Sequence, residues 1–595
     1  MTCRERTSGL VALRLIGALP AVSACVALGL LSGCVADGQP RLDTFAEAGP
    51  ARAASAPALR FDSASGNYLA GRYARNTRDF NAAAEFLSDA LSQDAENSRI
   101  RRQVFFSLAA AGKMDAAGNL AAEVLRDDKT SPVPNLTLIV ATIRAGDHEG
   151  ALAKLETLPK IGMNTFTAPL LKAWLLVGQE KYEDAIKAVE PLAKVSAFRT
   201  LRLHHTALIE DLAGNADAAE KAFQGALKSV KSVRTVQAYG RFLERAGRPE
   251  EARTLYDDYI KSNGGTSLQL EGDVARLDAK ESAVRIVDTS MDGIAEALFN
   301  LSGTLGQSRS VDLALIYSRL ALWIKPVFPQ AKILVGDLLD ILERREEALS
   351  AFASVDKTSS HYWGARLRRA TILNTLKRDD EAETLLRGMA EEEPQRSDAL
   401  IQLGDMLRAA DKFEDASEAY SRAIERTGDL REEDWSLFYS RGITYERSKK
   451  WALAEKDFLR ALELRPDQPF VLNYLGYSWV DQGRNLDRAK KMIQEAVRRR
   501  PNDGYIVDSL GWVLYRLGDF KGATRQLERA VTLRPEDPTI NDHLGDAYWR
   551  VGRRLEARFQ WRRALSLEPE ADQVPLIEKK LRRGMADLPA QGNKG

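Results

Sequence analysis

Cysteine, histidine and net charge are all scarce in this sequence. Three cysteines and five histidines among 595 residues exclude a disulfide scaffold and leave little material for a metal site. The 85 lysines and arginines balance 84 aspartates and glutamates, whereas nucleic-acid-binding proteins usually carry a basic excess. Apolar runs long enough to cross a bilayer are missing beyond residue 31. The composition is therefore that of a folded chain with no nucleic-acid partner.

Motifs that carry chemistry are also missing. The sequence has no glycine-rich phosphate loop, no HExxH pair and no nucleophile elbow. His204 and His205 are adjacent, so on a helix their rings diverge by about 100° and are expected to be ordinary surface or groove side chains. His148, His361 and His543 are isolated in the sequence. We therefore predict no catalytic residue, no metal site and no cofactor, and a protein that is not an enzyme.

The first feature that is present is an export signal. Three arginines within the first fourteen residues precede an apolar run from Leu15 to Leu31, which is typical of a secretory signal peptide. The run is long for such a peptide, so an uncleaved membrane anchor is the competing interpretation.

The end of the apolar run favours cleavage. The residues Leu31-Ser32-Gly33-Cys34 resemble the lipobox of bacterial lipoproteins, in which the chain is cut before the cysteine and the thiol carries lipid. This resemblance implies a signal peptide at 1–33 and lipidation of Cys34. A stretch at 34–60, rich in Ala, Pro, Gly and Ser, then predicts a flexible tether. Because Val35 and not Asp follows the cysteine, the resemblance implies the periplasmic face of the outer membrane.

The rest of the chain repeats with a period of 34 residues. One copy has Gly511, Ala523, Leu527, Ala530 and Pro535, and 34 positions later the next copy has the same small residues and proline, with the bulky Trp561 in place of Leu527. The spacings of four and three put the residues of the second half on one helical face. This pattern resembles the tetratricopeptide repeat (TPR), a helix–turn–helix unit, and about fourteen units fit between residues 64 and 571.

Each repeat position has a physical reason. The glycine at position 8 and the alanine at position 20 are small where the two helices of a unit cross. The bulky residue at position 24, such as Leu527, is expected to fill the gap between units. The proline at position 32 stops the second helix.

The predicted fold is an all-α TPR solenoid, a right-handed superhelix of helix–turn–helix repeats in two blocks. The N-terminal block of degenerate repeats covers 61–262, an irregular break covers 263–294, and the C-terminal block covers 295–571. Residues 572–595 form a capping helix and tail. The charges of that helix, Lys580 among them, are expected to be solvated.

Candidate partner-binding residues follow from the repeat frame. In the TPR family, positions 2, 5, 9 and 12 of each unit point into the concave groove. In the C-terminal block these positions hold Tyr439, Phe470, Asn473, Tyr477, Tyr505, Asp508, Trp512, Tyr515, Asp542, Asp546 and Trp549. Aromatic side chains in such a groove indicate a surface for a protein or peptide, and packing between units is the alternative role.

The wider resemblance suggests a function. The motifs around Leu475-Gly476, Leu510-Gly511 and Leu544-Gly545 are similar to those of bacterial TPR lipoproteins of the outer membrane. One member of this group binds a carboxyl-terminal processing protease and presents cell-wall hydrolases to it, and other proteins with these motifs have different partners. The resemblance implies a lipid-anchored scaffold or adaptor that binds protein partners, such as a protease or peptidoglycan hydrolase, in its groove.

Two alternatives remain open at this point. One is an assembly factor for an envelope machine, such as a pilus, a secretion pore or a polysaccharide exporter. The other is an enzyme with a helical active site, which would need clustered acids such as Asp508, Asp542 and Asp546.

Overall fold

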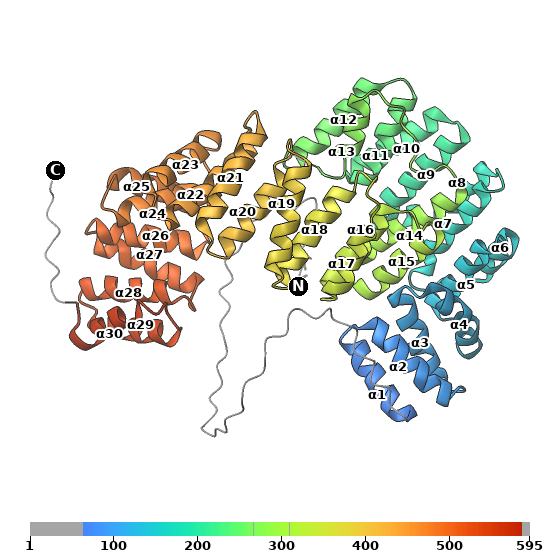
Figure 1. Ribbon diagram of the computed structural model, residues 1–595, viewed down its shortest axis with the longest axis horizontal. Coiled ribbons are helices and arrows are strands. Elements are labelled where there is room, and N and C mark those ends of the chain that lie inside the picture. The colour runs from blue at the N-terminus through green and yellow to red at the C-terminus, as the bar shows by residue number, and fades with distance from the viewer. Residues whose placement is uncertain (1–62, 266, 309, 586–595) are drawn as a thin grey trace, which may run out of the picture. The chain divides into compact units, whose positions relative to one another are not determined.

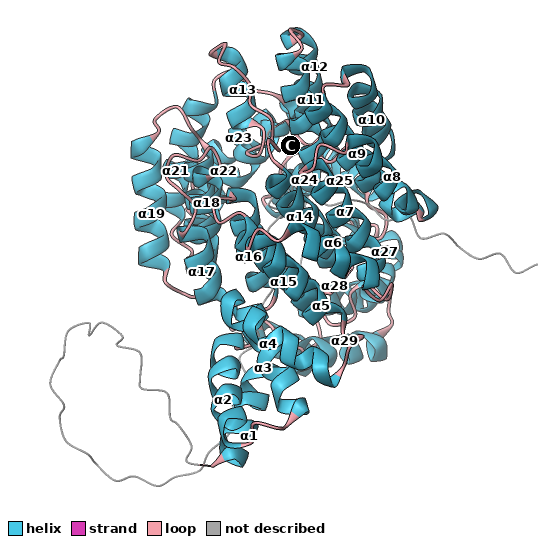
Figure 2. Ribbon diagram, turned by 90° about the vertical axis from the view of Figure 1, so that its right-hand side faces the viewer, coloured by secondary structure: helices cyan, strands magenta, loops and turns pink. Residues whose placement is uncertain are grey.

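The structure, a computed structural model, describes residues 63–265, 267–308 and 310–585. In those ranges every regular element is a helix, and Figure 2 shows helices and loops without a strand among the residues it describes. The all-α prediction is confirmed. The signal peptide, Cys34 and the tether lie outside the described residues. Within the described ranges, no helix combines the length and the apolar character needed to cross a membrane.

The chain divides into two compact units, and their boundary in the sequence lies between Ala382 and Glu383. Unit 1 contains the helices from α1 to α18 (Figure 1). Their bounds are α1 (Ala64–Asn76), α2 (Phe80–Gln93), α3 (Ser98–Ala111), α4 (Met114–Asp127), α5 (Pro132–Arg144), α6 (His148–Thr157), α7 (Asn164–Val177), α8 (Tyr182–Val189), η1 (Glu190–Lys194), η2 (Ser196–Phe198), α9 (Arg199–Ala213), α10 (Ala216–Ser229), α11 (Val233–Arg245), α12 (Pro249–Ser262), α13 (Glu271–Asp278), α14 (Ser290–Gln307), α15 (Val311–Ile324), α16 (Pro329–Ile341), α17 (Arg345–Ala353) and α18 (Tyr362–Thr375).

Unit 2 contains the helices from α20 to α30, and α19 (Asp379–Glu392) spans the boundary. The bounds in unit 2 are α20 (Asp398–Ala409), α21 (Phe413–Thr427), η3 (Glu432–Asp434), α22 (Trp435–Arg447), α23 (Trp451–Leu464), α24 (Pro469–Asp481), α25 (Leu486–Arg499), α26 (Gly504–Arg516), α27 (Phe520–Leu533), α28 (Pro538–Arg550), α29 (Arg554–Ser566) and α30 (Val574–Arg583). Consecutive helices pack as hairpins, for example α26 on α27 and α28 on α29. The repeat frame therefore predicts the hairpins correctly.

The glycine at position 8 is required by the bulky residue at position 24 of the same hairpin. A Cβ atom on Gly511 would lie 2.5 Å from Cγ of Leu527, and one on Gly545 would lie 2.5 Å from Nε1 of Trp561. The bulky side chain therefore packs against the glycine within its own unit. It also contacts the next unit, as where the ring centre of Phe458 lies 5.1 Å from that of Tyr474, so the expectation that it fills the gap between units is confirmed there. The two helices approach so closely that a larger residue at position 8 would take the space of the position-24 side chain.

In unit 1 the chain returns to fill its own concave side. Helix α14 packs on α7, and α15 packs on α3, α4 and α5, although these partners lie more than a hundred residues earlier. The hydroxyl groups of Thr167 and Tyr317 are 3.0 Å apart across this contact. Nε1 of Trp323 donates to Asp115 at 2.9 Å. The hollow of the early hairpins is therefore occupied along much of its length by α14 and α15.

A buried ion pair joins α14 to the early helices. Arg234 on α11 donates two hydrogen bonds, of 2.9 and 2.7 Å, to Glu296 on α14, a residue that is 1% exposed. Burial alone would raise the pKa of Glu296, but the guanidinium of Arg234 outweighs burial and holds the pKa well below its usual range. The pair satisfies two charges that would otherwise be costly to bury.

Two histidines lie beside this pair and are buried. His205 accepts a hydrogen bond of 3.1 Å from Nε1 of Trp174, and Nδ1 of His204 lies 3.2 Å from the hydroxyl of Thr235. The expectation that both are surface or groove side chains is wrong, because the return of α14 covers them. Burial lowers the pKa of His205 to about 3, with the neighbouring His204 adding to the effect.

The predicted break at 263–294 contains α13 and the start of α14. The helices that follow it up to Ala382 belong to the same compact unit as the early hairpins. The carboxylate of Asp273, in α13, is buried and accepts hydrogen bonds from Arg241 and Gln237. This segment is therefore tied to α11 by its charges.

Candidate functional site

The predicted groove residues lie on the first helices of four hairpins in unit 2. These helices are α22, α24, α26 and α28. Gly442, Gly476, Gly511 and Gly545 face the second helix of each hairpin, so the opposite side of each first helix is turned away from it. The period thus places the predicted groove positions on a shared face.

Aromatic side chains populate the accessible part of this face. Tyr505 is 51% exposed, whereas Phe470, Tyr477 and Trp512 are half-buried. The guanidinium of Arg500 lies 4.5 Å from the ring centre of Phe470. We call Phe470, Asn473, Tyr477, Tyr505 and Trp512 the aromatic face. Half-buried aromatic side chains offer large apolar contact area at a small cost in side-chain entropy.

Two members of the aromatic face have polar atoms in apolar surroundings. Oδ1 of Asn473 is buried and has no hydrogen-bond partner in the described structure. Burial raises the pKa of Tyr477 to about 12, and the carboxylates of Asp508 and Asp481 add to this effect. The Tyr477 hydroxyl therefore stays protonated at neutral pH and is available as a donor, while Asn473 offers an acceptor.

A histidine fixes the position of Trp512. Asp508 on α26 and His543 on α28 are both buried, and Nδ1 of His543 donates to Oδ1 of Asp508 at 3.0 Å. The imidazole stacks on the indole of Trp512, with ring centres 4.1 Å apart. Burial alone would lower the pKa of His543, but Asp508 outweighs burial and raises it. Asp508 therefore supports the aromatic face from beneath.

Tyr515 and Tyr439 serve mainly as packing residues. Tyr515 is buried, stacks on Trp512 with ring centres 5.0 Å apart, and accepts a hydrogen bond from Nε of Arg550. Tyr439 lies in a cluster of rings with Phe458 and Tyr474, at centre distances of 6.1 and 5.9 Å. These contacts match the packing role that the sequence leaves open as the alternative.

The C-terminal helix covers the three remaining groove positions. Nζ of Lys580 on α30 donates to Asp542 at 2.7 Å and to Asp546 at 2.8 Å. Nε1 of Trp549 donates to the carbonyl of Met585 at 2.9 Å. The expectation that Lys580 is solvated is therefore wrong, because two buried or half-buried carboxylates bind it.

Burial and mutual charge shift the pKa values of the groups in this ion cluster. Asp546 is 4% exposed and also accepts a hydrogen bond of 2.9 Å from Nε1 of Trp561. Burial raises the pKa of Asp546, and the nearby Asp542 adds to this effect. Burial alone would lower the pKa of Lys580, but the two carboxylates outweigh it and raise the pKa. The acids at Asp508, Asp542 and Asp546 are thus engaged in structural contacts.

Sequence reasoning missed two residues of this site. His543 appears isolated because its partner Asp508 is one repeat away, although the two occupy neighbouring positions on successive first helices. Lys580 lies after the last repeat, where the period gives no frame. A search for acids and bases separated by about one period would have found the first contact. In the described ranges no group of His, Cys, Asp or Glu could hold a metal ion.

Comparison with known proteins identifies the repeat. The family model described as "Tetratricopeptide repeat" matches residues 213–265, 401–469 and 475–539. The chain contains tetratricopeptide repeats. The match at 475–539 includes Tyr477, Tyr505 and Trp512 of the aromatic face.

A curated relative shares part of the sequence. The TPR repeat-containing protein PA4667 of Pseudomonas aeruginosa is 31% identical over 191 residues, which are 32% of this chain and 32% of that protein. The match thus spans about a third of the length of the relative.

Several solved TPR-like structures are similar at low identity. The APC/C hetero-tetramer Cut9–Hcn1 is 15% identical, with a TM-score of 0.36, covering 88% of this chain and 97% of that one. YrrB, a TPR protein with an unusual peptide-binding site, is 20% identical with a TM-score of 0.27, covering 33% and 97%. Yeast Tom70 is 13% identical with a TM-score of 0.32, covering 87% and 94%.

Proposed function

We propose that this chain is a lipid-anchored scaffold on the periplasmic face of the outer membrane, and that its aromatic face binds a protein partner. The observation that carries the binding role is the aromatic face itself. Exposed and half-buried rings, with an unpartnered amide oxygen on Asn473, lie on the first helices of adjacent TPR hairpins. TPR folds typically serve protein–protein interaction, which agrees with this role.

The anchor would raise the local concentration of the chain, and of the partners it binds, at the membrane. Lipidation at Cys34 would hold the chain at the membrane, and the stretch at 34–60 would let the folded units reach partners in the surrounding space. Two acyl chains or more bind a bilayer firmly, whereas one chain binds only marginally. A scaffold that holds two partners raises the effective concentration of each for the other.

We propose a protease or a peptidoglycan hydrolase as the partner. This proposal rests on the resemblance of the lipobox and of the C-terminal repeats to lipoprotein adaptors. In this role the chain would supply binding and positioning, and the partner would supply the chemistry.

Crosslinking in intact cells tests the binding role. A photo-reactive residue at position 505 is expected to capture a defined envelope protein, because Tyr505 is 51% exposed on the aromatic face. Position 559 is the matched control, since Phe559 is a 63% exposed aromatic residue on α29, a second helix. Recovery of the same proteins at both positions, or of none at 505, would refute the role of the aromatic face.

A substitution measures the strength of the contact. Once the partner is known, Tyr505→Ala is expected to weaken binding about 30-fold, because a central tyrosine in an interface contributes about 2 kcal/mol. Phe559→Ala should leave the affinity unchanged. Equal losses in both variants would contradict the assignment.

A second substitution tests the anchor separately. Cys34→Ser is expected to move the protein from the membrane fraction to the soluble fraction, and the wild-type N-terminal peptide should carry lipid in mass spectrometry. Membrane retention of Cys34→Ser would refute lipidation at this residue and would favour the uncleaved anchor.

A further inference from the structure

The charges of unit 2 are unevenly distributed among the second helices of its hairpins, although the whole chain is nearly neutral. In the earlier hairpins, α21 and α23 together carry seven acidic and four basic residues. In the last three hairpins, α25, α27 and α29 together carry four acidic and twelve basic residues. These three helices follow one another along unit 2 (Figure 1), so basic residues accumulate toward its C-terminal end.

Part of this charge lies on the side of each second helix that faces away from the first helix. Leu527 and Trp561 pack against the glycines of their first helices. Arg525 and Phe559 come two residues before them, which is about 200° around the helix axis. The side that carries Arg525 and Phe559 is therefore turned away from the first helices and from the aromatic face.

The 34-residue period repeats two positions on this outer side. Lys491, Arg525 and Phe559 occupy one of them, and Lys521 and Leu555 occupy the other, about one turn earlier. Arg562 follows Phe559 by about one turn. All of these residues are exposed. We call the set the basic outer face: Lys491, Lys521, Arg525, Leu555, Phe559 and Arg562.

The cations of the basic outer face have no acidic partners. On α21 and α23, Arg422 and Arg460 each donate to a glutamate at 2.6 Å. Among the described residues, by contrast, none of the four cations of the basic outer face has a carboxylate within ion-pair distance. The one acid at the two repeat positions is Asp487 on α25. Four positive charges thus remain available to an anionic partner.

Two large apolar side chains project from the α29 part of this face. Leu555 is 83% exposed and Phe559 is 63% exposed, and they lie one turn apart. Three arginines of the same helix, Arg558, Arg562 and Arg563, lie within four residues of Phe559. Removing the two apolar side chains from water would be favourable. Apolar side chains next to cationic ones are typical of a surface that binds at a membrane interface.

We propose that the basic outer face docks on a bilayer that contains anionic phospholipid. Leu555 and Phe559 insert between the head groups, and the four cations bind the phosphates. Because the first helices lie on the other side of each hairpin, docking turns the aromatic face toward the aqueous phase. The surface lies within unit 2 and does not depend on how the N-terminus is anchored.

Charge and apolar character together favour a bilayer over other partners. A nucleic acid or an acidic polysaccharide offers negative charge but no apolar phase for Leu555 and Phe559. A second copy of this chain would bring two basic faces together, and they would repel each other. An anionic bilayer offers phosphates and, directly beneath them, acyl chains.

Fluorescence quenching in reconstituted vesicles tests the proposal. The full chain carries an apolar fluorescent amino acid at position 559, and the vesicles contain lipid with a spin label near the head group. In equal parts phosphatidylcholine and phosphatidylglycerol, we expect a docked-to-free ratio at least about tenfold higher than in phosphatidylcholine alone. Position 505 is the control, because Tyr505 is an exposed ring on the aromatic face and a probe there should stay unquenched. No quenching at 559, or equal quenching at both positions or in both lipids, would overturn the proposal.

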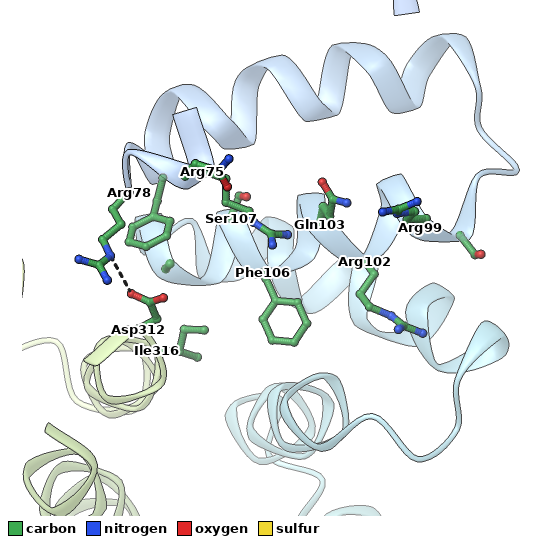
Figure 3. Close-up of a pocket in the computed structure, with 13 residues that line it drawn as sticks. Arg75, Arg78, Arg99, Arg102, Gln103, Phe106, Ser107, Asp312 and Ile316 are labelled. Carbon is green, nitrogen blue, oxygen red and sulfur yellow. Dashed lines mark ion pairs between the residues drawn. The ribbon is translucent and has the colours of Figure 1, made fainter. Parts of the chain in front are cut away.

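A matched pair of charge variants separates this face from general attraction of charge. Lys521→Gln/Arg525→Gln should lower the docked-to-free ratio at least about tenfold in anionic vesicles. Arg75→Gln/Arg99→Gln should leave it unchanged. This control also removes two exposed arginines, from the lining of a cavity of about 710 Å³ in unit 1 (Figure 3). Equal losses in the two variants would overturn the proposal.

Leu555→Gln separates insertion into the bilayer from binding of charge alone. Loss of the leucine side chain should lower the docked-to-free ratio at least about tenfold. Thermal stability should stay the same, because Leu555 is 83% exposed in the free chain. Unchanged docking of Leu555→Gln would overturn insertion, and release of the protein by polyglutamate in that case would assign the face to an acidic protein instead.

Salt distinguishes docking from the N-terminal anchor. At about 1 M salt the Debye length falls to about 3 Å, so quenching at position 559 should be lost while the anchored chain stays with the vesicles. Quenching that persists at this salt would overturn the role of the cations. Protein that leaves the vesicles would count against the anchor and not against docking. Fractionation of Cys34→Ser after a salt wash separates the two in cells.

Discussion

Removal of the Lys580 amine should release the C-terminal helix from unit 2. Nζ of Lys580 is 2.7 Å from Asp542 and 2.8 Å from Asp546, and the Asp546 carboxylate is almost fully buried. Removing one partner of a buried ion pair typically costs 3–5 kcal/mol, because the remaining charge is buried alone. The Lys580 side chain is 21% exposed, so we expect the lower end, about 3 kcal/mol.

The loss should appear locally, because undocking of α30 relieves the uncompensated charges. Amide hydrogen exchange in α30 is expected to accelerate by about 100-fold in Lys580→Ala, the factor that corresponds to about 3 kcal/mol. Trp549 gives a second signal, since its indole N–H donates to Met585 and loses this partner on undocking. Lys579→Ala is the matched control, because Lys579 is exposed on the same helix.

The destabilisation caused by Lys580→Ala should also depend on pH, with a defined sign. Burial raises the pKa of Asp546, so its contribution to stability is full at low pH and is lost as the pH rises through the raised value. Without Lys580 this pKa rises further, and the deficit of Lys580→Ala should be largest near pH 8 and smaller near pH 5. A deficit no larger than that of Lys579→Ala, or one that grows on acidification, would refute the account of this cluster.

Two further measurements test the core. Gly545→Ala is expected to lower the free energy of unfolding by about 2 kcal/mol, because the new Cβ would lie 2.5 Å from the buried ring of Trp561; Gly388→Ala, with no atom near its Cβ, should be neutral or stabilising in urea denaturation. His205, with its pKa lowered to about 3, stabilises the fold above the unfolded pKa near 6.5 and loses this contribution as the pH falls. In urea denaturation, the free energy of unfolding should therefore fall by about 2 kcal/mol less between pH 7 and pH 5 in His205→Gln than in wild type. Equal falls in the two proteins would contradict this.

The hairpins were predictable because their signal is local. Each glycine at position 8 meets a bulky residue of its own unit, as with Gly511 and Leu527, so the constraint repeats along the sequence. The face that carries Tyr505 and Trp512 follows from the same frame. What the period does not encode is which distant surface covers a given hairpin.

The residues that sequence reasoning misplaced all lie at such long-range contacts. His204 and His205 are polar in the sequence, yet α14 buries them because Arg234 and Glu296 neutralise each other at that contact. Lys580 pairs with acids one repeat earlier, beyond the end of the periodic pattern. Such contacts depend on complementary charges between segments far apart, and a single sequence does not pair them.

Because α14 and α15 pack back on the early helices of unit 1, the two units are expected to fold in different ways. In unit 2 successive hairpins contact mainly their neighbours, so the region can grow one hairpin at a time, and its contact order is low. In unit 1 the contact between Thr167 and Tyr317 closes a loop of 150 residues. The early hairpins must therefore wait, with apolar side chains such as Leu136 uncovered, until α15 has been synthesised. Unit 1 should fold late and all at once, and should be the part of the chain that needs a chaperone.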